Sequence, residues 1–115
     1  FERVIHHEVF HIIHLQHKEV FNEEEWIKFN NSKFKYAECS TCTKNIGLDK
    51  YDKTKGFFTE YSKSTASEDM AEVYSHMIFL KKNDIDQIRK LDPILNNKIS
   101  YIESKIKQID TSFIF

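Results

Sequence analysis

Two histidines four residues apart, with a glutamate directly after the first, stand near the start of the chain. They belong to the pentapeptide His7-Glu8-Val9-Phe10-His11. On an α-helix, positions four apart lie on one face, about 6 Å apart along the axis, so both imidazoles can bind one metal ion. Glu8 is one position round from His7, where a carboxylate can accept a proton from water at that metal. The spacing indicates the metal-binding helix of a zinc hydrolase, although an ordinary solvated helix can carry the same string.

A hydrolytic zinc centre needs a third protein ligand and keeps its fourth position for water or substrate. Glu68 and Glu72 follow a polar, turn-rich stretch and are four residues apart, so they share one face of a predicted helix. One carboxylate can bind the ion while the other orients a ligating histidine. Thr65 and Glu68 also match a helix-capping box, and acidic residues favour a first helical turn. Taken alone, this segment therefore also fits an ordinary helix start.

The two segments together resemble a family of zinc metallopeptidases. The pentapeptide, followed by Glu68-Asp69-Met70-Ala71-Glu72 and with Tyr61 seven residues before the first of these glutamates, is similar to the gluzincins of the anthrax lethal factor type. It is also similar to zinc metallohydrolase lipoproteins associated with substrate import. The resemblance covers residues 4–17 and 56–79.

This resemblance implies a role for each residue of the pattern. The implied zinc ligands are His7, His11 and Glu68. Glu8 would be the catalytic general base, and Tyr61 would donate a hydrogen bond to the oxyanion of the tetrahedral intermediate. By its spacing, Glu72 would orient a ligating histidine. The resemblance further implies a peptide or protein substrate and favours a secreted or extracytoplasmic location.

A second class of zinc hydrolase offers an alternative third ligand. Metzincins continue the pentapeptide with x-x-G-x-x-H, and His17 stands at the final position of that spacing. The glycine of that motif lets the chain leave the helix, but here the position holds His14. If the helix continues through His14, then His17 lies about 15 Å along the axis from His7. The sequence therefore favours Glu68 as the third ligand.

Length and composition fit one helical domain. The chain has 115 residues, of which 40% are hydrophobic and 14% aromatic, which is enough for a packed core. Its formal charge of −1, with both signs interspersed, provides no basic surface for nucleic acid. No apolar run is long enough to span a bilayer. Because the sequence opens without Met only six residues before His7, we expect the domain, residues 1–115, to be truncated on its N-terminal side.

Periodicity and capping signals predict mainly helices. A first helix is expected over residues 2–17, with Val4, Ile5, Ile12 and Leu15 among its apolar positions. Further helices are expected from Asn22, around Glu68, after Asp84, and from Asp92-Pro93. Residues 30–60 read as loop with short extended pieces. The enzymes that the chain resembles carry a sheet before the metal helix; here that sheet either lies outside this chain, which we favour, or is reduced to short β pieces such as 34–36 and 56–58. The last helix carries an apolar seam, more typical of core than of a partner surface: Leu95, Ile99, Ile102, Ile106 and Ile109.

The sequence thus predicts a mainly α partial zincin domain that binds zinc and hydrolyses peptide bonds. The alternative is a catalytically inactive relative that serves as a binding or assembly module through the Ile-rich last helix. Metal content separates the two, because a pure interaction module has no need of zinc. The pair Cys39 and Cys42 has the spacing of half a zinc knuckle, but no second pair completes a four-cysteine site, so a thiol pair or a local disulfide is expected.

Overall fold

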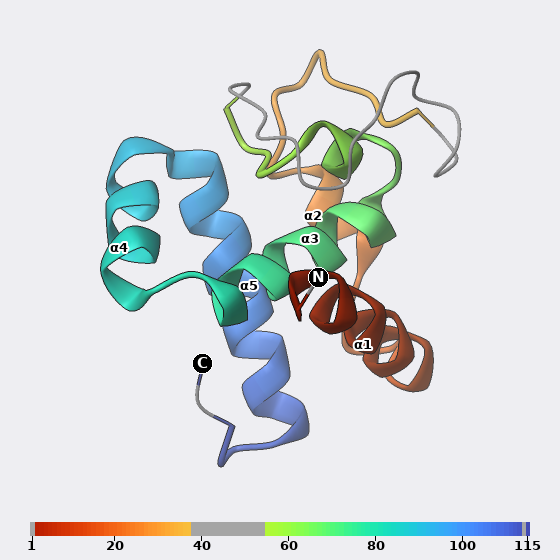
Figure 1. The fold of residues 1–115 in the computed structure, drawn as a ribbon. Coiled ribbons are helices and arrows are strands. Elements are labelled where there is room, and N and C mark those ends of the chain that lie inside the picture. The colour runs from red at the N-terminus through yellow and green to blue at the C-terminus, as the bar shows by residue number, and fades with distance from the viewer. Residues whose placement is uncertain (1, 38–54, 114) are drawn as a thin grey trace.

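The computed structural model describes residues 2–37, 55–113 and 115, and these ranges fold mainly into helices (Figure 1). The described elements are α1 (Glu2–Gln16), α2 (Glu23–Ile27), the 3-10 helix η1 (Glu60–Lys63), α3 (Ala66–Phe79), α4 (Lys82–Leu91) and α5 (Pro93–Ile109). The predicted mainly α fold is confirmed. Cys39 and Cys42 lie outside the described residues. No described helix has the length and apolar character that crossing a membrane requires.

The segments 34–36 and 56–58, where short β pieces were the less favoured option, are not strands in the structure. The Gly56 amide donates to Asp92 Oδ2 at 2.7 Å, and its carbonyl accepts from Lys98 Nζ at 2.6 Å. Phe57 packs on Phe34, with ring centroids 4.6 Å apart. The N-cap residue of α5, Asp92, and Lys98 within α5 therefore bind the backbone of Gly56.

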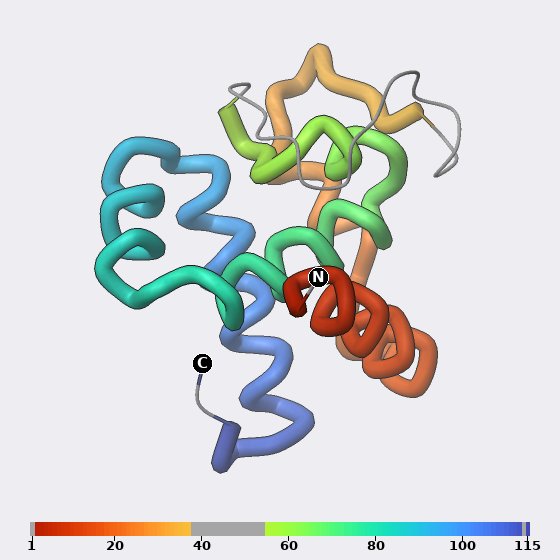
Figure 2. The backbone as a smooth tube through the Cα atoms, viewed as in Figure 1, coloured from red at the N-terminus to blue at the C-terminus, as the bar shows by residue number. Residues whose placement is uncertain are grey.

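Helix α3 is the centre of the fold and packs against α1, α2, η1 and α5 (Figure 2). Nine of its residues are buried, among them Met70, Ala71 and Val73. Helix α5 turns its apolar seam towards this centre, with Leu95, Ile99, Ile102 and Ile106 buried and Ile109 half-buried. Each such side chain contributes about 1.5–3 kcal/mol on leaving water. The seam predicted from the sequence is therefore part of the core.

Three helices begin at the residues that the capping signals predicted. The side chains of Asn22, Thr65 and Asp92 accept hydrogen bonds from the backbone amides three residues ahead, at the starts of α2, α3 and α5. Helix α4 starts earlier than expected, at Lys82. Its N-cap residue, Lys81, makes no side-chain capping bond, so the sequence carries no local signal for this start.

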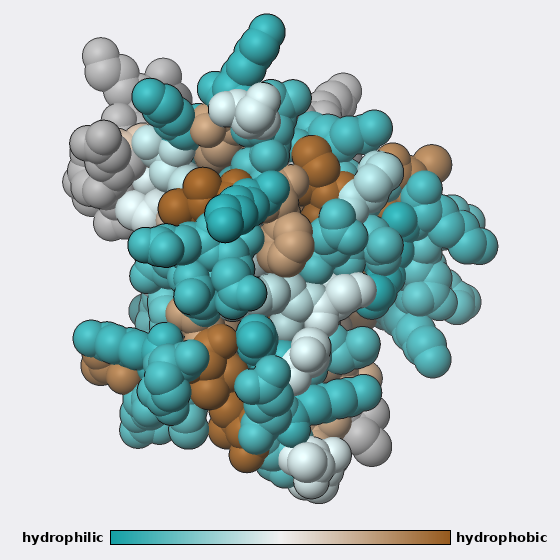
Figure 3. Space-filling view, turned by 180° about the vertical axis from the view of Figure 1, so that it is seen from behind, coloured by the Kyte–Doolittle hydropathy of each residue, from teal (hydrophilic) through white to brown (hydrophobic). Residues whose placement is uncertain are grey.

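Helix α1 turns a largely polar face to the core. Its buried residues are Arg3, His7, Phe10 and His14. Three of the apolar side chains of this helix are largely solvent-exposed, at 50% for Ile5, 58% for Ile12 and 68% for Leu15. The buried polar groups are tolerated because α3 supplies partners for them, as Glu72 does for Arg3 and His7. Viewed from behind, apolar side chains reach the surface in separate patches on a mainly hydrophilic face (Figure 3).

A buried ion pair joins α3 to α5 one residue beyond Glu68. Lys98 Nζ lies 2.7 Å from Asp69 Oδ2, and both side chains are fully buried. The same carboxylate oxygen accepts from the Tyr36 hydroxyl at 2.6 Å and from the Trp26 indole at 3.1 Å. The ammonium also lies 4.0 Å from the centre of the Phe57 ring. These contacts fix the first turn of α3, and so the backbone that carries Glu68.

Gly56 lets the chain approach α5 closely enough to make this connection. Its φ of 97° is a conformation that residues with a side chain rarely adopt. A Cβ at this position would lie 2.6 Å from Ile94 Cγ2. The turn leads directly through Phe57 and Phe58 into η1, which carries Tyr61.

Candidate metal centre

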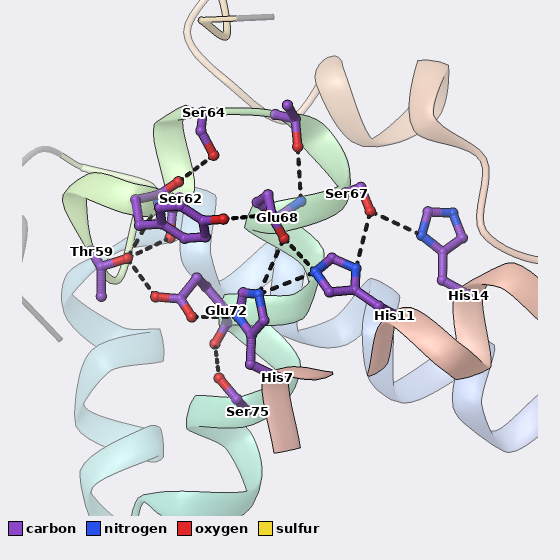
Figure 4. A network of polar contacts seen from close by, with 12 residues as sticks. His7, His11, His14, Thr59, Ser62, Ser64, Ser67, Glu68, Glu72 and Ser75 are labelled. Carbon is purple, nitrogen blue, oxygen red and sulfur yellow. Dashed lines mark hydrogen bonds and ion pairs between the residues drawn. The ribbon is translucent and has the colours of Figure 1, made fainter. Parts of the chain in front are cut away.

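The structure brings His7, His11 and Glu68 to one point between α1 and α3 (Figure 4). One ligand atom from each residue lies within 4.8 Å of the other two, and within the described ranges no other trio of metal-binding side chains does so. His7 Nε2 is 3.1 Å from His11 Nε2 and 3.1 Å from Glu68 Oε1. His11 Nε2 also pairs with Glu68 Oε1. Residues 61 positions apart in sequence thus converge through the packing of two helices.

The donor set fits zinc. Two imidazole nitrogens and one carboxylate oxygen are the ligands that catalytic zinc takes from proteins, with a fourth position kept open. The cluster is accessible on one side, since the His11 side chain is 29% exposed while that of His7 is 5% exposed. Three potential lone-pair donors this close repel one another unless a proton or a cation lies between them. A bound cation would relieve that repulsion.

Glu72 lies behind His7, where its spacing from Glu68 predicted a supporting group. Its Oε2 is 2.7 Å from His7 Nδ1, so the carboxylate can fix the ring with Nε2 facing the cluster. The guanidinium of Arg3 donates to the same oxygen at 2.6 Å, and the Thr59 hydroxyl donates to Oε1 at 2.6 Å. Glu72 is fully buried, and these three partners from α1 and the segment before η1 hold it in place.

The charges of the cluster shift its proton equilibria. Burial would lower the pKa of His7, but its hydrogen bonds to Glu68 and Glu72 outweigh burial and raise that pKa to about 9. Burial would raise the pKa of Glu68, but hydrogen bonds from His11, His7 and Tyr61 lower it. The same competition, with His7 and Thr59 as partners, lowers the pKa of Glu72. Without a metal, the cluster therefore holds two carboxylates and a protonated His7 at neutral pH.

Tyr61 reaches the cluster from η1. Its hydroxyl donates to Glu68 Oε2, the oxygen that does not face the histidines, and its ring centroid is 5.9 Å from that of His7. Thr59 caps η1 by accepting from the Ser62 amide, which fixes the turn that presents Tyr61. The structure thus pairs the Tyr61 hydroxyl with the candidate ligand Glu68.

Glu8 lies on the exposed surface of α1, next in sequence to His7. Among the described residues, no hydrogen bond or ion pair engages its carboxylate. Because one residue corresponds to a turn of 100° about the helix axis, Glu8 flanks the face that His7 and His11 present. Its carboxylate is therefore available to water beside the cluster.

His17 does not join the cluster. Helix α1 continues through His14 and ends at Gln16, as the missing glycine predicted, and His17 Nδ1 lies 4.0 Å from Glu19 Oε1. His14 is buried one turn beyond His11. His76 stacks on Phe58, with ring centroids 4.4 Å apart.

Three residues of the site were missed in the sequence. Arg3 is four residues before His7, so its helical spacing could have placed it on the same face. Ser67 immediately precedes Glu68, yet a serine in a first helical turn is too common to stand out. Thr59 carries no signal, because its contact with Glu72 depends on how the turn at Gly56 packs on α3.

Two helices of this mainly helical chain bring together two histidines and a glutamate that could hold a metal ion. A family model described as "Putative zinc-binding metallo-peptidase" matches residues 1–111. The chain belongs to this family. Neither the curated proteins nor the solved structures contain a match to the chain.

Proposed function

We propose that the protein is a zinc-dependent peptidase of gluzincin type, with His7, His11 and Glu68 as zinc ligands. The observation that carries this proposal is the convergence of their ligand atoms within 4.8 Å, in a chain whose family is described as zinc-binding and peptidase-like. The neighbouring groups support it, because Glu72 holds His7 and Tyr61 holds Glu68. Peptides or proteins are the substrates that the family description favours.

When bound, zinc would supply a Lewis acid that polarises the scissile carbonyl and makes a water nucleophilic near neutral pH. Glu8 would accept a proton from the attacking water and later donate it to the leaving amine. The hydroxyl of Tyr61, which donates to Glu68 Oε2 in this structure, would donate to the developing oxyanion. Glu72, held by Arg3 and Thr59, would keep the His7 ring in its ligating orientation.

The alternative, an assembly module that acts through the Ile-rich helix, has less support. The isoleucines of α5 at positions 99, 102 and 106 are buried in the chain's own core. They are therefore not available as a docking face while the domain is folded. A module of this kind would also have no chemical use for an exposed carboxylate beside a His₂Glu cluster.

Zinc binding is the first test. The purified protein should hold about one zinc per molecule after dialysis. Glu68→Ala should weaken zinc binding at least about tenfold, as loss of a ligand does, whereas His17→Ala should leave it nearly unchanged and serves as the matched control. A folded protein that takes up no zinc refutes the proposal. If His17→Ala loses the metal and Glu68→Ala keeps it, the third ligand is wrong.

Turnover is the second test. A mixture of peptides that covers many sequences should be cleaved by the zinc-loaded protein, and Glu8→Gln should abolish cleavage while zinc stays bound. The amide has nearly the shape of the carboxylate but cannot take a proton from water. Cleavage by Glu8→Gln at the wild-type rate would remove Glu8 from the mechanism.

A further inference from the structure

The second ligating histidine has polar neighbours of its own, on the side of its ring that faces away from the cluster. His11 Nδ1 lies 3.4 Å from the hydroxyl of Ser67, and the same hydroxyl lies 3.4 Å from His14 Nδ1 (Figure 4). Ser67 is the residue before Glu68, and His14 is one turn beyond His11 on α1. The Ser67 oxygen thus joins two imidazoles of one helix from the first turn of another.

The chemistry of these atoms gives the chain of hydrogen bonds a direction. A histidine that binds a metal through Nε2 carries its proton on Nδ1, so His11 would donate to Ser67 Oγ. The serine hydroxyl then has one proton to donate, and His14 Nδ1 is the acceptor within reach. On the far side of that ring, His14 Nε2 faces Glu23 Oε2 at 3.9 Å, and a carboxylate there favours the proton on Nε2. Every donor along the line then faces an acceptor.

We propose that Ser67 and His14 are positioning residues of the metal centre, which hold His11 through a hydroxyl–imidazole relay just as Glu72 holds His7. This inference rests on the proposed function, since it assigns His11 Nε2 to the metal. Neither residue touches the cluster atoms themselves. They act through the orientation of the His11 ring.

The two histidines are thereby supported by groups of different charge. His7 is backed by a carboxylate that Arg3 partly neutralises, at 2.6 Å. His11 is backed by neutral groups, because a serine cannot ionise and His14 accepts through an unprotonated nitrogen. A second carboxylate in place of Ser67 would add a negative charge beside Glu68 and make the bound metal a weaker Lewis acid. The relay orients His11 without that added charge.

The burial of His14 makes the arrangement specific. His14 is 8% exposed and packs edge to face on Phe21, with ring centroids 5.6 Å apart, and at 5.7 Å from Phe10. These aromatic contacts fix the ring plane and so aim Nδ1 at Ser67. They also give His14 a packing role, which an experiment must separate from hydrogen bonding.

Paired substitutions at Ser67 and His14 separate the hydrogen-bonding role from the packing role. Ser67→Ala removes the hydroxyl, while Ser67→Thr keeps it. His14→Phe keeps the aromatic packing but removes the acceptor, while His14→Asn gives up the ring but places an amide oxygen near the position of Nδ1. Zinc affinity by chelator competition should fall about tenfold in Ser67→Ala, as expected for loss of a group that orients a ligand, and by less in His14→Phe. Ser67→Thr should restore most of the affinity, and His14→Asn should bind zinc better than His14→Phe.

Two further measurements distinguish positioning from packing. The thermal midpoint of the metal-free protein should fall less in Ser67→Ala than in His14→Asn, which gives up the packed ring. Long-range ¹H–¹⁵N spectra of the zinc-bound protein should show the His11 proton on Nδ1 and the His14 proton on Nε2. Zinc affinities that follow ring packing, with His14→Phe at the wild-type value and His14→Asn reduced, would overturn the relay, as would a His14 proton on Nδ1. If even the wild type binds no zinc, the proposed function fails and the relay fails with it, whereas equal affinities in all variants refute the relay alone.

Discussion

The charge state of His7 predicts how zinc affinity depends on pH. Zinc can bind His7 only through an unprotonated Nε2, yet the two neighbouring carboxylates raise the pKa of His7 to about 9. With that pKa, only about 1% of the metal-free molecules have a neutral His7 at pH 7. Zinc must therefore displace a proton, and the affinity at pH 7 should lie about 100-fold below its limit at high pH.

Zinc affinity should rise with pH, because deprotonation of His7 frees its Nε2 for the metal. Between pH 6 and pH 8, each unit of rising pH should strengthen zinc binding about tenfold, or by about 1.4 kcal/mol, from His7 alone. An ordinary histidine, with a pKa of 6.5, would produce almost no change above pH 7.5. Calorimetry at pH 7, in buffers that differ in ionisation enthalpy, should find about one proton released per zinc bound.

The carboxylate of Glu72 contributes to the raised pKa of His7, and its removal tests this cause. Glu72→Gln removes one of the two carboxylates that raise the pKa of His7, so its affinity curve should level off at a lower pH than that of the wild type. The comparison depends on the shape of the curve and not on the absolute affinity. A wild-type affinity that changes less than about threefold between pH 7 and pH 8 would show that His7 is not protonated in the metal-free cluster.

Four other outcomes are expected. Lys98→Met should lower the free energy of unfolding in urea by about 3–5 kcal/mol, because it leaves the carboxylate of Asp69 buried without its counter-ion; a loss below about 1 kcal/mol would contradict this. Tyr61→Phe should lower kcat by about 10²-fold with zinc content unchanged, and an unaltered kcat would remove Tyr61 from the mechanism. Gly56→Ala should destabilise the protein by about 1–2 kcal/mol in the same denaturation experiment, whereas an unchanged midpoint would mean that the turn relaxes freely. The protonated His7 should stabilise the metal-free protein fully below pH 6.5 and lose that contribution as the pH rises through about 9, so its thermal midpoint should fall over this window.

The sequence was most informative where the physics is local. Three helix starts could be predicted because a capping side chain and its amide partner are three residues apart, as at Asn22 and Asp92. The meeting of His7, His11 and Glu68 was predicted from helical spacing and from a family resemblance, and the fold brings them together. Helical spacing alone could not have shown whether Glu68 or Glu72 lies next to both histidines, because that depends on the position of α3 along the axis of α1.

The sequence was less informative where tertiary contacts decide the structure. The apolar residues Ile5, Ile12 and Leu15 are exposed. The inner face of α1 carries Arg3 and His7, because Glu72 is buried opposite them. A polar side chain can be buried when a hydrogen-bonding partner is buried beside it, and a single sequence does not show which residue that partner is. A short β piece at 56–58 was the less favoured option for the sheet, and in the structure the Gly56 backbone instead binds the side chains of Asp92 and Lys98.

The amino group of Lys98 is buried in the interior of the folded protein. Its side chain is fully buried, and its ammonium donates to Gly56 O and Asp69 Oδ2 beneath the Phe57 ring. Acylating reagents need a free, deprotonated amine, and trypsin needs an extended chain around the lysine, so neither reaches Lys98 in the native protein. Exposed lysines of the same chain, such as Lys82 and Lys107, react from the folded state. The rate at which Lys98 is modified should therefore report how often the core between α3 and α5 opens. Peptide mapping by mass spectrometry can measure that rate at this one side chain.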